Sequence, residues 1–308
     1  MIAESFITVP LTQIFRSTIS MAAAVLVLFG PSVDTIARDN QTSTNVVRSF
    51  PTRGLVRELP ADGKSIVVRH EEIPGYMPKM TMELVVKNPA ELRSIAEGDI
   101  ITFDLVVTDD DHHVENIRKV GTSTEAKPAP KKPAPHISEL GPGDPMPEVT
   151  LLDENGKKVS LSDFRGKAVA FTFIFSRCPL PDYCPRMNKH FDRAREILLE
   201  NKSSPKNWQF VSISFDAEFD KPAVLKRYGN SYRHGNPDRW LFAAIAPEQL
   251  SEIAPQLDFR YERADGSFSH NLRTVVLDTQ GRIFQQFDNN LWSAEDLAKA
   301  MAEAAQVK

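Results

Sequence analysis

Short runs of hydrophobic positions, separated by turn signals, fill residues 53 to 120. Ala61-Asp62-Gly63 and Glu97-Gly98-Asp99 are two of these turn signals. The runs predict five strands, namely Arg53–Glu58, Lys64–His70, Met80–Val86, Asp99–Thr108 and Val114–Val120. Five short strands in so small a region favour an all-β, closed or nearly closed barrel of the oligonucleotide/oligosaccharide-binding (OB) type.

Strand-like and helix-like patterns alternate from residue 139 onward. Residues 168 to 176 form an almost continuous apolar run, which indicates a strand buried on both faces. The pattern predicts strands at 148–153, 158–161, 168–176, 209–215, 240–244, 274–277 and 282–287, and helices at 185–199, 222–232, 247–257 and 293–304. Alternation that ends in a hairpin and a helix predicts a thioredoxin-like α/β fold.

Two segments follow neither pattern. Residues 121 to 138 are rich in proline, lysine and alanine, which predicts a solvated linker between one domain at 50–120 and another at 139–308. Near the N-terminus an apolar stretch follows Arg16, so residues 1 to 37 are expected to be a signal peptide or an N-terminal anchor. The protein is therefore expected in the periplasm, or attached to the outer face of the inner membrane.

The composition excludes few functions. Hydrophobic residues make up 41% of the 308 positions and charged residues 25%, which is ordinary for a soluble globular protein. The formal net charge of -4 provides no basic field, and nucleic-acid binding is therefore not expected.

The only two cysteines, Cys178 and Cys184, lie between the long apolar run and a helical pattern. At that position backbone N–H groups and the positive end of the helix dipole favour thiolate over thiol. Pro179 and Pro181 hold the intervening segment in a turn, while Pro185 suits the start of a helix. The two sulfurs are therefore expected to meet above the helix N-terminus, where they could bind a soft metal or form a redox-active pair. A structural disulfide in an exported protein is the alternative.

A second group of soft donors lies in the predicted β-domain. Met80 and Met82 have the period-two spacing that places both on one face of a strand, and His70 ends the preceding strand. Thioethers favour Cu(I) and Ag(I) and do not form disulfides. From spacing alone, packing in a small core is the alternative. The adjacent residues His112 and His113, which follow three aspartates, are a candidate for a second site, but they are interpreted as part of a polar hairpin turn.

Several motifs occur in order along the second region. They are Ser176-Arg177-Cys178-Pro179, Cys184-Pro185, the strand 211–216 with Asp220 and Pro222 after it, and Ser269-His270 before the strand 274–278 with Gly281. With these motifs residues 141 to 308 resemble the Sco/SenC family. The resemblance implies that Cys178, Cys184 and His270 bind copper, and that the protein helps to assemble the dinuclear copper centre of cytochrome c oxidase. Here five residues separate the cysteines, where the family has three.

The first region has a resemblance of its own, carried by its histidine and its Met-Thr-Met segment. Residues 54 to 120 are similar to the small periplasmic copper/silver-binding domain of the CusF type. The resemblance implies that His70, Met80 and Met82 bind Cu(I) or Ag(I). Where that family has a tryptophan over the metal, this chain has Met77 with Tyr76 beside it. The site is therefore either richer in thioethers, with Met77 as a further candidate ligand, or it leaves the metal more exposed.

Together these features favour an exported metallochaperone that captures Cu(I) and delivers copper. Its expected partners are the copper ion and a client copper protein such as cytochrome c oxidase subunit II. The alternative is an enzyme, a thiol-disulfide oxidoreductase that reduces the cysteines of a client copper protein. The five-residue spacing, and the lack of a proline between Asp258 and Thr274, count against a general reductase. A thiol peroxidase would not account for the methionines.

Overall fold

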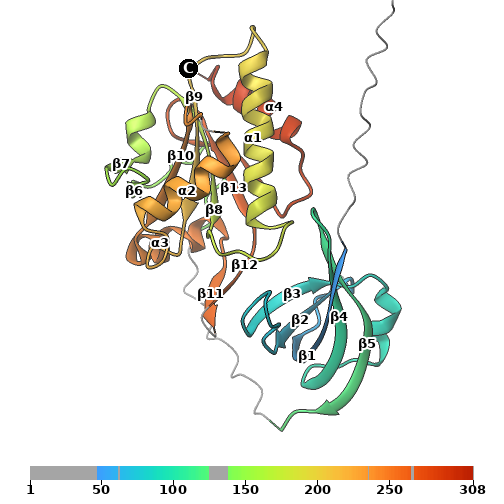
Figure 1. Ribbon diagram of the computed structural model, residues 1–308. Coiled ribbons are helices and arrows are strands. Elements are labelled where there is room, and N and C mark those ends of the chain that lie inside the picture. The colour runs from blue at the N-terminus through green and yellow to red at the C-terminus, as the bar shows by residue number, and fades with distance from the viewer. Residues whose placement is uncertain (1–46, 62, 125–137, 235, 265–266, 308) are drawn as a thin grey trace, which may run out of the picture. The chain divides into compact units, whose positions relative to one another are not determined.

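The computed structural model describes residues 47–61, 63–124, 138–234, 236–264 and 267–307 (Figure 1). The predicted leader lies outside these residues, as does most of the predicted linker. None of the described helices is long and apolar enough to cross a membrane.

Residues 47 to 124, called the β region below, form one antiparallel sheet. Its strands are β1 (Arg48–Glu58), β2 (Ser65–His70), β3 (Met80–Val85), β4 (Asp99–Val107) and β5 (His112–Thr122), with the 3-10 helix η1 (Pro89–Ser94) before β4. The strand order is β3-β2-β1-β4-β5. A single isolated bridge, Val86 to Val114, joins the two edges of this sheet. The five strands predicted from the sequence are thus present, but the hydrogen-bonded ladder does not close fully.

Two strands of the β region are longer than predicted. The first strand begins at Arg48 rather than Arg53, because residues 48 to 55 continue the ladder with β4. The last strand runs to Thr122, so Gly121 and Thr122 pair with β4 and are not part of a linker. Along β3 the alternate residues Met80, Met82 and Leu84 are buried, as the period of two requires.

Residues 138 to 307, called the α/β region below, contain a seven-stranded sheet in the order β14-β13-β8-β9-β10-β6-β7. The strands are β6 (Thr150–Asp153), β7 (Lys158–Ser160), β8 (Ala168–Ile174), β9 (Trp208–Ser214), β10 (Trp240–Ile245), β13 (Arg273–Leu277) and β14 (Ile283–Asp288). Strands β8, β9 and β10 are parallel, and β8 is buried at every position. This is the predicted thioredoxin-like α/β arrangement.

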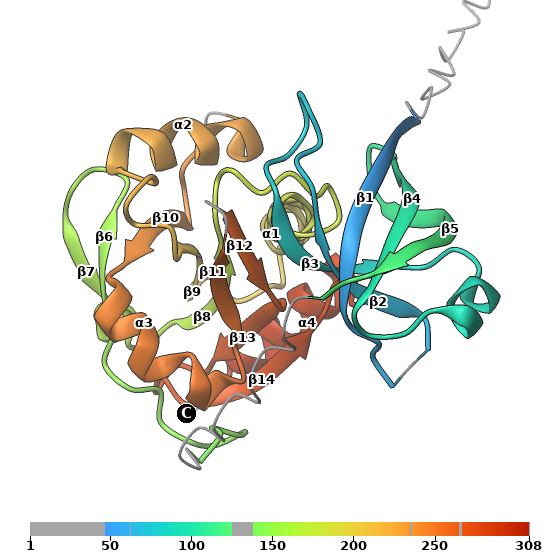
Figure 2. The same cartoon turned by 90° about the horizontal axis from the view of Figure 1, so that it is seen from below.

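The helices of the α/β region are α1 (Cys184–Glu200), α2 (Pro222–Arg233), α3 (Pro247–Ile253) and α4 (Ala294–Ala304), with η2 (Leu161–Phe164) and η3 (Pro255–Leu257) as 3-10 helices. Helix α1 packs against both α4 and α2, and Figures 1 and 2 show α1 and α4 side by side. The helix predicted over 247–257 is interrupted, because Pro255 has no N–H with which to continue α3.

Two differences from the prediction shape the site. Strand β8 ends at Ile174 rather than at residue 176, because the N–H of Ser176 donates to the Asp220 side chain instead of a neighbouring strand. A short hairpin, β11 (Tyr261–Ala264) and β12 (Ser267–His270), forms a separate two-stranded sheet that the pattern did not predict. This hairpin carries His270.

Candidate metal sites

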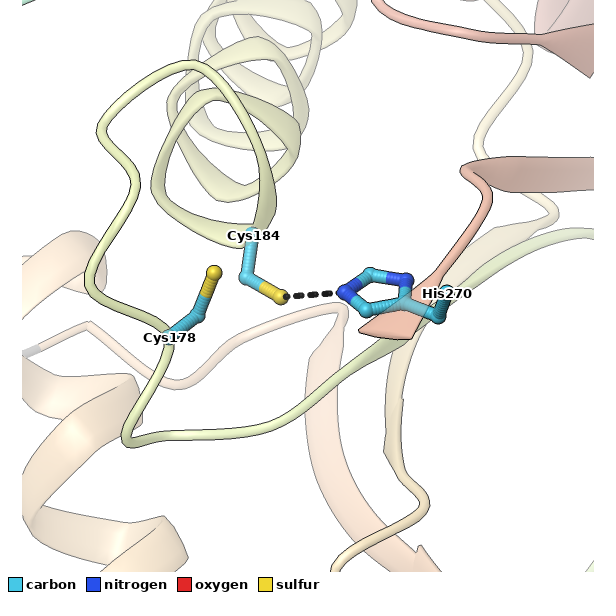
Figure 3. Close-up of side chains that lie close together, drawn as sticks. All are labelled: Cys178, Cys184 and His270. Carbon is cyan, nitrogen blue, oxygen red and sulfur yellow. Dashed lines mark hydrogen bonds between the residues drawn. The ribbon is translucent and has the colours of Figure 1, made fainter. Parts of the chain in front are cut away.

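Three soft or borderline donors meet at the N-terminal end of α1. Cys184 is the first residue of that helix and is buried, while Cys178 lies in the preceding loop and is partly exposed. The Cys184 Sγ lies 3.9 Å from Nε2 of His270. The donor atoms of Cys178, Cys184 and His270 all lie within 4.8 Å of one another (Figure 3). Both cysteines are free thiols.

Local turns bring the two sulfurs together. The Cys178 N–H donates to the Phe175 carbonyl at 3.2 Å, and the Tyr183 N–H donates to the Leu180 carbonyl at 3.3 Å. The chain therefore folds back twice between the end of β8 and the start of α1, as the prolines suggested. Helix α1 begins at Cys184 itself, one residue before the predicted start, so its backbone N–H is among those without a partner inside the helix.

Two carboxylates from the segment after β9 hold the start of the cysteine loop. Asp220, fully buried, accepts hydrogen bonds from the backbone N–H and the hydroxyl of Ser176 and from the hydroxyl of Ser214. Asp216 accepts from Nε of Arg177 at 3.1 Å and from its Nη2 at 2.5 Å. The two residues that directly precede Cys178 are therefore fixed from outside the loop.

The imidazole of His270 is held by its own backbone and by aromatic rings. Its Nδ1 lies 2.7 Å from the carbonyl oxygen of Asn271. Because a carbonyl can only accept, Nδ1 carries the proton in this contact and Nε2 is left to face the sulfurs. The rings of Phe215, Phe175 and Tyr183 lie 5.0, 5.6 and 5.7 Å from the imidazole, centroid to centroid.

The two thiols have opposite pKa shifts. Burial would raise the pKa of Cys178, but hydrogen bonds from Cys184 and His270 and the charge of His270 outweigh it and lower the pKa to about 5. Burial and the neighbouring Cys178 thiolate raise the pKa of Cys184 well above its usual range. Cys178 is therefore the thiolate at neutral pH, and Cys184 keeps its proton.

In the β region, His70 and the methionines lie at one end of the sheet. His70, the last residue of β2, pairs directly with Met80, the first residue of β3. The exposed fractions of His70, Met80 and Met82 are 1%, 3% and 4%. The Nδ1 of His70 lies 2.6 Å from the Glu71 carbonyl, while Nε2 is buried and has no hydrogen-bond partner. Burial lowers the pKa of His70, so the ring is neutral and Nε2 keeps its lone pair.

The buried His70 Nε2, which has no hydrogen-bond partner, indicates whether a metal would fit at this site. Leaving such a group unsatisfied costs about 1–3 kcal/mol, and native structures rarely retain it without a reason. His70 pairs directly with Met80 across β2 and β3, and Met82 is buried on the same face of β3 as Met80. One imidazole and two thioethers are a donor set for a soft monovalent cation.

The predicted position of His112 and His113 differs from the one in the structure. His112 and His113 are the first residues of β5 and do not lie in the turn, which spans Thr108–Asp111 and is closed by the Thr108 N–H to Asp111 carbonyl bond. The turn interpretation was therefore wrong. Sequence reasoning also assigned no role to Asp220, although its place after a buried strand was visible.

Comparison with known proteins defines the class of this chain. Residues 139–306, more than half of the chain, match the family model SCO1/SenC. The protein therefore belongs to the SCO1/SenC family. Residues 49–119 match a second model, that of the copper binding periplasmic protein CusF.

Individual relatives are more distant. The SCO1 protein homolog of Bacillus subtilis is 33% identical over 107 residues, which cover 34% of this chain and 52% of that protein. The mitochondrial SCO2 homolog of Bos taurus is 26% identical over 169 residues, 53% of this chain and 59% of its own length. The chain thus spans between half and three fifths of the length of these two relatives.

Solved structures with related sequences cover the same region. The SCO1/SenC family lipoprotein of Bacillus anthracis superimposes with a TM-score of 0.48 at 20% identity, over 55% of this chain and all of that one (100%). The structure of yeast Sco1 with copper bound gives a TM-score of 0.45 at 18% identity, over 54% of this chain and 90% of that one.

Proposed function

We propose that this protein is an exported copper metallochaperone. In this proposal the β region captures Cu(I), and Cys178, Cys184 and His270 hold copper for delivery, either to the copper centre of cytochrome c oxidase or to other periplasmic copper proteins. The observation that carries the proposal is the convergence of those three donors from two separate elements. It agrees with the SCO1/SenC membership and with the copper named for yeast Sco1.

The donor set suits copper chemically. Two thiolates and one imidazole provide the soft trigonal environment that Cu(I) prefers, and Cu(II) needs further ligands. Cys178 has already lost its proton at neutral pH, whereas Cys184 has not. Copper binding should therefore release the proton of Cys184, because a ligating sulfur is a thiolate.

The β region supplies the capture site in this proposal. Its match to the CusF model and the buried, unpartnered Nε2 of His70 support Cu(I) or Ag(I) binding by His70, Met80 and Met82. We propose that the domain predicted at 50–120, which its strands extend to 48–122, is a nearly closed, OB-like barrel, and that a linker after Thr122 joins it to a domain at 139–308. Joining two sites in one chain raises the effective concentration of one near the other to about the millimolar range, which favours transfer within one molecule.

A second candidate function is thiol-disulfide exchange with a client copper protein. The specific observation in its favour is the opposite pKa shifts, which pair a nucleophilic Cys178 thiolate with a protonated Cys184. Cys178 would attack the client disulfide and form a mixed disulfide. Cys184, after losing its proton, would then displace the client's other cysteine sulfur. The client gains two thiols, the protein ends as a Cys178–Cys184 disulfide, and an external dithiol must reduce it again.

Anaerobic Cu(I) titration of the reduced full chain tests the first candidate. We expect two separable sites, and His270→Ala should lower the affinity of one of them by at least about 100-fold, since losing an outer partner alone costs 10–100-fold. His234→Ala removes an exposed histidine at the end of α2 and should change neither site. If His270→Ala leaves both affinities intact, His270 is not a ligand.

The same samples separate the second candidate. Reduction of insulin, or of a client disulfide, faster than by a Cys178→Ser control would support the exchange activity. Equal rates together with two copper sites would reject it.

A further inference from the structure

The donor set of the β region contains a buried thioether beyond Met80 and Met82. Met77 has an exposed fraction of 3% and belongs to the same buried cluster as those two residues. It lies between His70 and Met80, which pair directly across β2 and β3. Met77 therefore shares a buried core cluster with Met80 and Met82, and it lies in the loop that joins His70 to Met80.

The backbone around Met77 is fixed by a tight turn. Ile73-Pro74-Gly75-Tyr76 has proline at its second position and Gly75 at its third with a φ of +73°, the pattern of a type II turn. The Tyr76 N–H donates to the Ile73 carbonyl at 3.0 Å, which closes the turn. Ile73 and Met77 then exchange both backbone hydrogen bonds, at 2.9 and 3.0 Å. A thioether held by such a loop is pre-organised rather than free to rearrange.

Among the described residues of the β region, neither a tryptophan nor the neighbouring Tyr76 takes the place of Met77. The ring of Tyr76 is stacked on Phe50, with centroids 4.5 Å apart and planes 3° from parallel. The guanidinium of Arg48 lies 5.2 Å from the same ring. All three tryptophans of the chain, Trp208, Trp240 and Trp292, lie in the α/β region. An indole over the metal is thus absent from the β region, and its aromatic neighbour is engaged elsewhere.

We propose that Met77 is a third thioether ligand, so that the β region binds Cu(I) or Ag(I) with one imidazole and three methionine sulfurs. This inference rests on the proposed capture function of the β region. Four neutral donors favour a soft monovalent cation over Cu(II) or Zn(II). They also complete the coordination without a cation–π contact.

Methionine methyl NMR with Ag(I) as the probe tests the ligand set. The full chain with Cys178→Ser and Cys184→Ser, labelled with 13C at its eight methionine methyl groups, is titrated with one equivalent of Ag(I). We expect three methyl resonances to shift, those of Met77, Met80 and Met82. Met77→Leu should remove one of the three and lower the Ag(I) affinity about tenfold.

A matched control is Met146→Leu, which changes a buried methionine of the α/β region and should remove only an unshifted resonance. Both leucine variants conserve volume and should remain folded, which thermal unfolding verifies. If Met80 and Met82 shift and Met77 does not, the third ligand is wrong and the capture site stands. If none of the three shifts, the capture site fails as well.

Discussion

Removal of the Asp220 side chain should release the start of the cysteine loop. The carboxylate is fully buried and accepts three hydrogen bonds, two from Ser176 and one from Ser214. In Asp220→Ala the Ser176 N–H cannot turn elsewhere, whereas the hydroxyls can partly re-orient. With about 1–3 kcal/mol for each buried group left unsatisfied, we expect a loss of about 3 kcal/mol in the free energy of unfolding.

The same change should weaken copper binding at Cys178, Cys184 and His270. Ordering the freed backbone again on binding costs about 1–2 kcal/mol per residue, so a net loss of about 2 kcal/mol, roughly 30-fold in Cu(I) affinity, is expected. Asp220→Asn keeps the shape and one acceptor oxygen, and its effect should be about one third as large in free energy.

Denaturant unfolding of the reduced apoprotein and competitive Cu(I) titration measure these two effects. The titration uses a background of Met80→Leu and Met82→Leu, so that the α/β site is observed alone. Asp278→Asn is the control, because Asp278 accepts from the N–H groups of Gln280 and Arg282 at the opposite end of β13 from His270. The expectation is refuted if the free energy of unfolding of Asp220→Ala lies within about 1 kcal/mol of the parent value and the variant binds Cu(I) equally well.

Two further predictions follow from contacts at the sites. Gly54 pairs with His70, and a Cβ at Gly54 would collide with the Val68 side chain and lie 3.1 Å from the His70 Cα. Gly54→Ala should therefore lower the free energy of unfolding by about 1–3 kcal/mol and lower the Ag(I) affinity of the β region about tenfold. Gly121→Ala, whose Cβ meets nothing closer than 3.9 Å, is the control in thermal unfolding and Ag(I) titration, and equal effects of the two variants would contradict the argument. Because the Cys178 pKa is about 5, its iodoacetamide alkylation, followed by mass spectrometry of the reduced apoprotein, should be constant above pH 6 and fall below pH 5. A rate that still climbs between pH 7 and 8.5, as for an ordinary thiol, would show that the pKa is not lowered.

Most elements could be predicted because local pattern and burial agree. Strand β8 lies between β9, to which it is parallel, and β13, to which it is antiparallel, and its continuous apolar run indicates burial on both faces. The β11–β12 hairpin escaped prediction because each strand has only four residues, and charged residues such as Glu262 and Arg263 break the apolar pattern.

The site was predictable only in part. The two cysteines are visible from composition and position, and His270 followed from the resemblance to the Sco/SenC family. The anchoring of Ser176 by Asp220 could not be predicted, since it joins residues 44 positions apart through a tertiary hydrogen bond. The opposite pKa shifts of Cys178 and Cys184 depend on the mutual approach of the donors, which spacing alone does not determine.

The two candidate sites orient their histidines by the same local device. His70 and His270 each end a strand, and each Nδ1 lies within 2.7 Å of the carbonyl of the next residue, Glu71 or Asn271. Because the acceptor of the Nδ1 proton is the backbone of the next residue, no side chain from elsewhere in the fold is needed to fix the tautomer that leaves Nε2 free. The sites differ in their sulfurs. Thioethers neither lose protons nor form disulfides, so metal loading of the β region should not depend on the redox state of the two cysteines. The α/β site, by contrast, requires both cysteines to be reduced. On the proposed function, capture would therefore proceed in an oxidising compartment, whereas delivery would wait for a reductant.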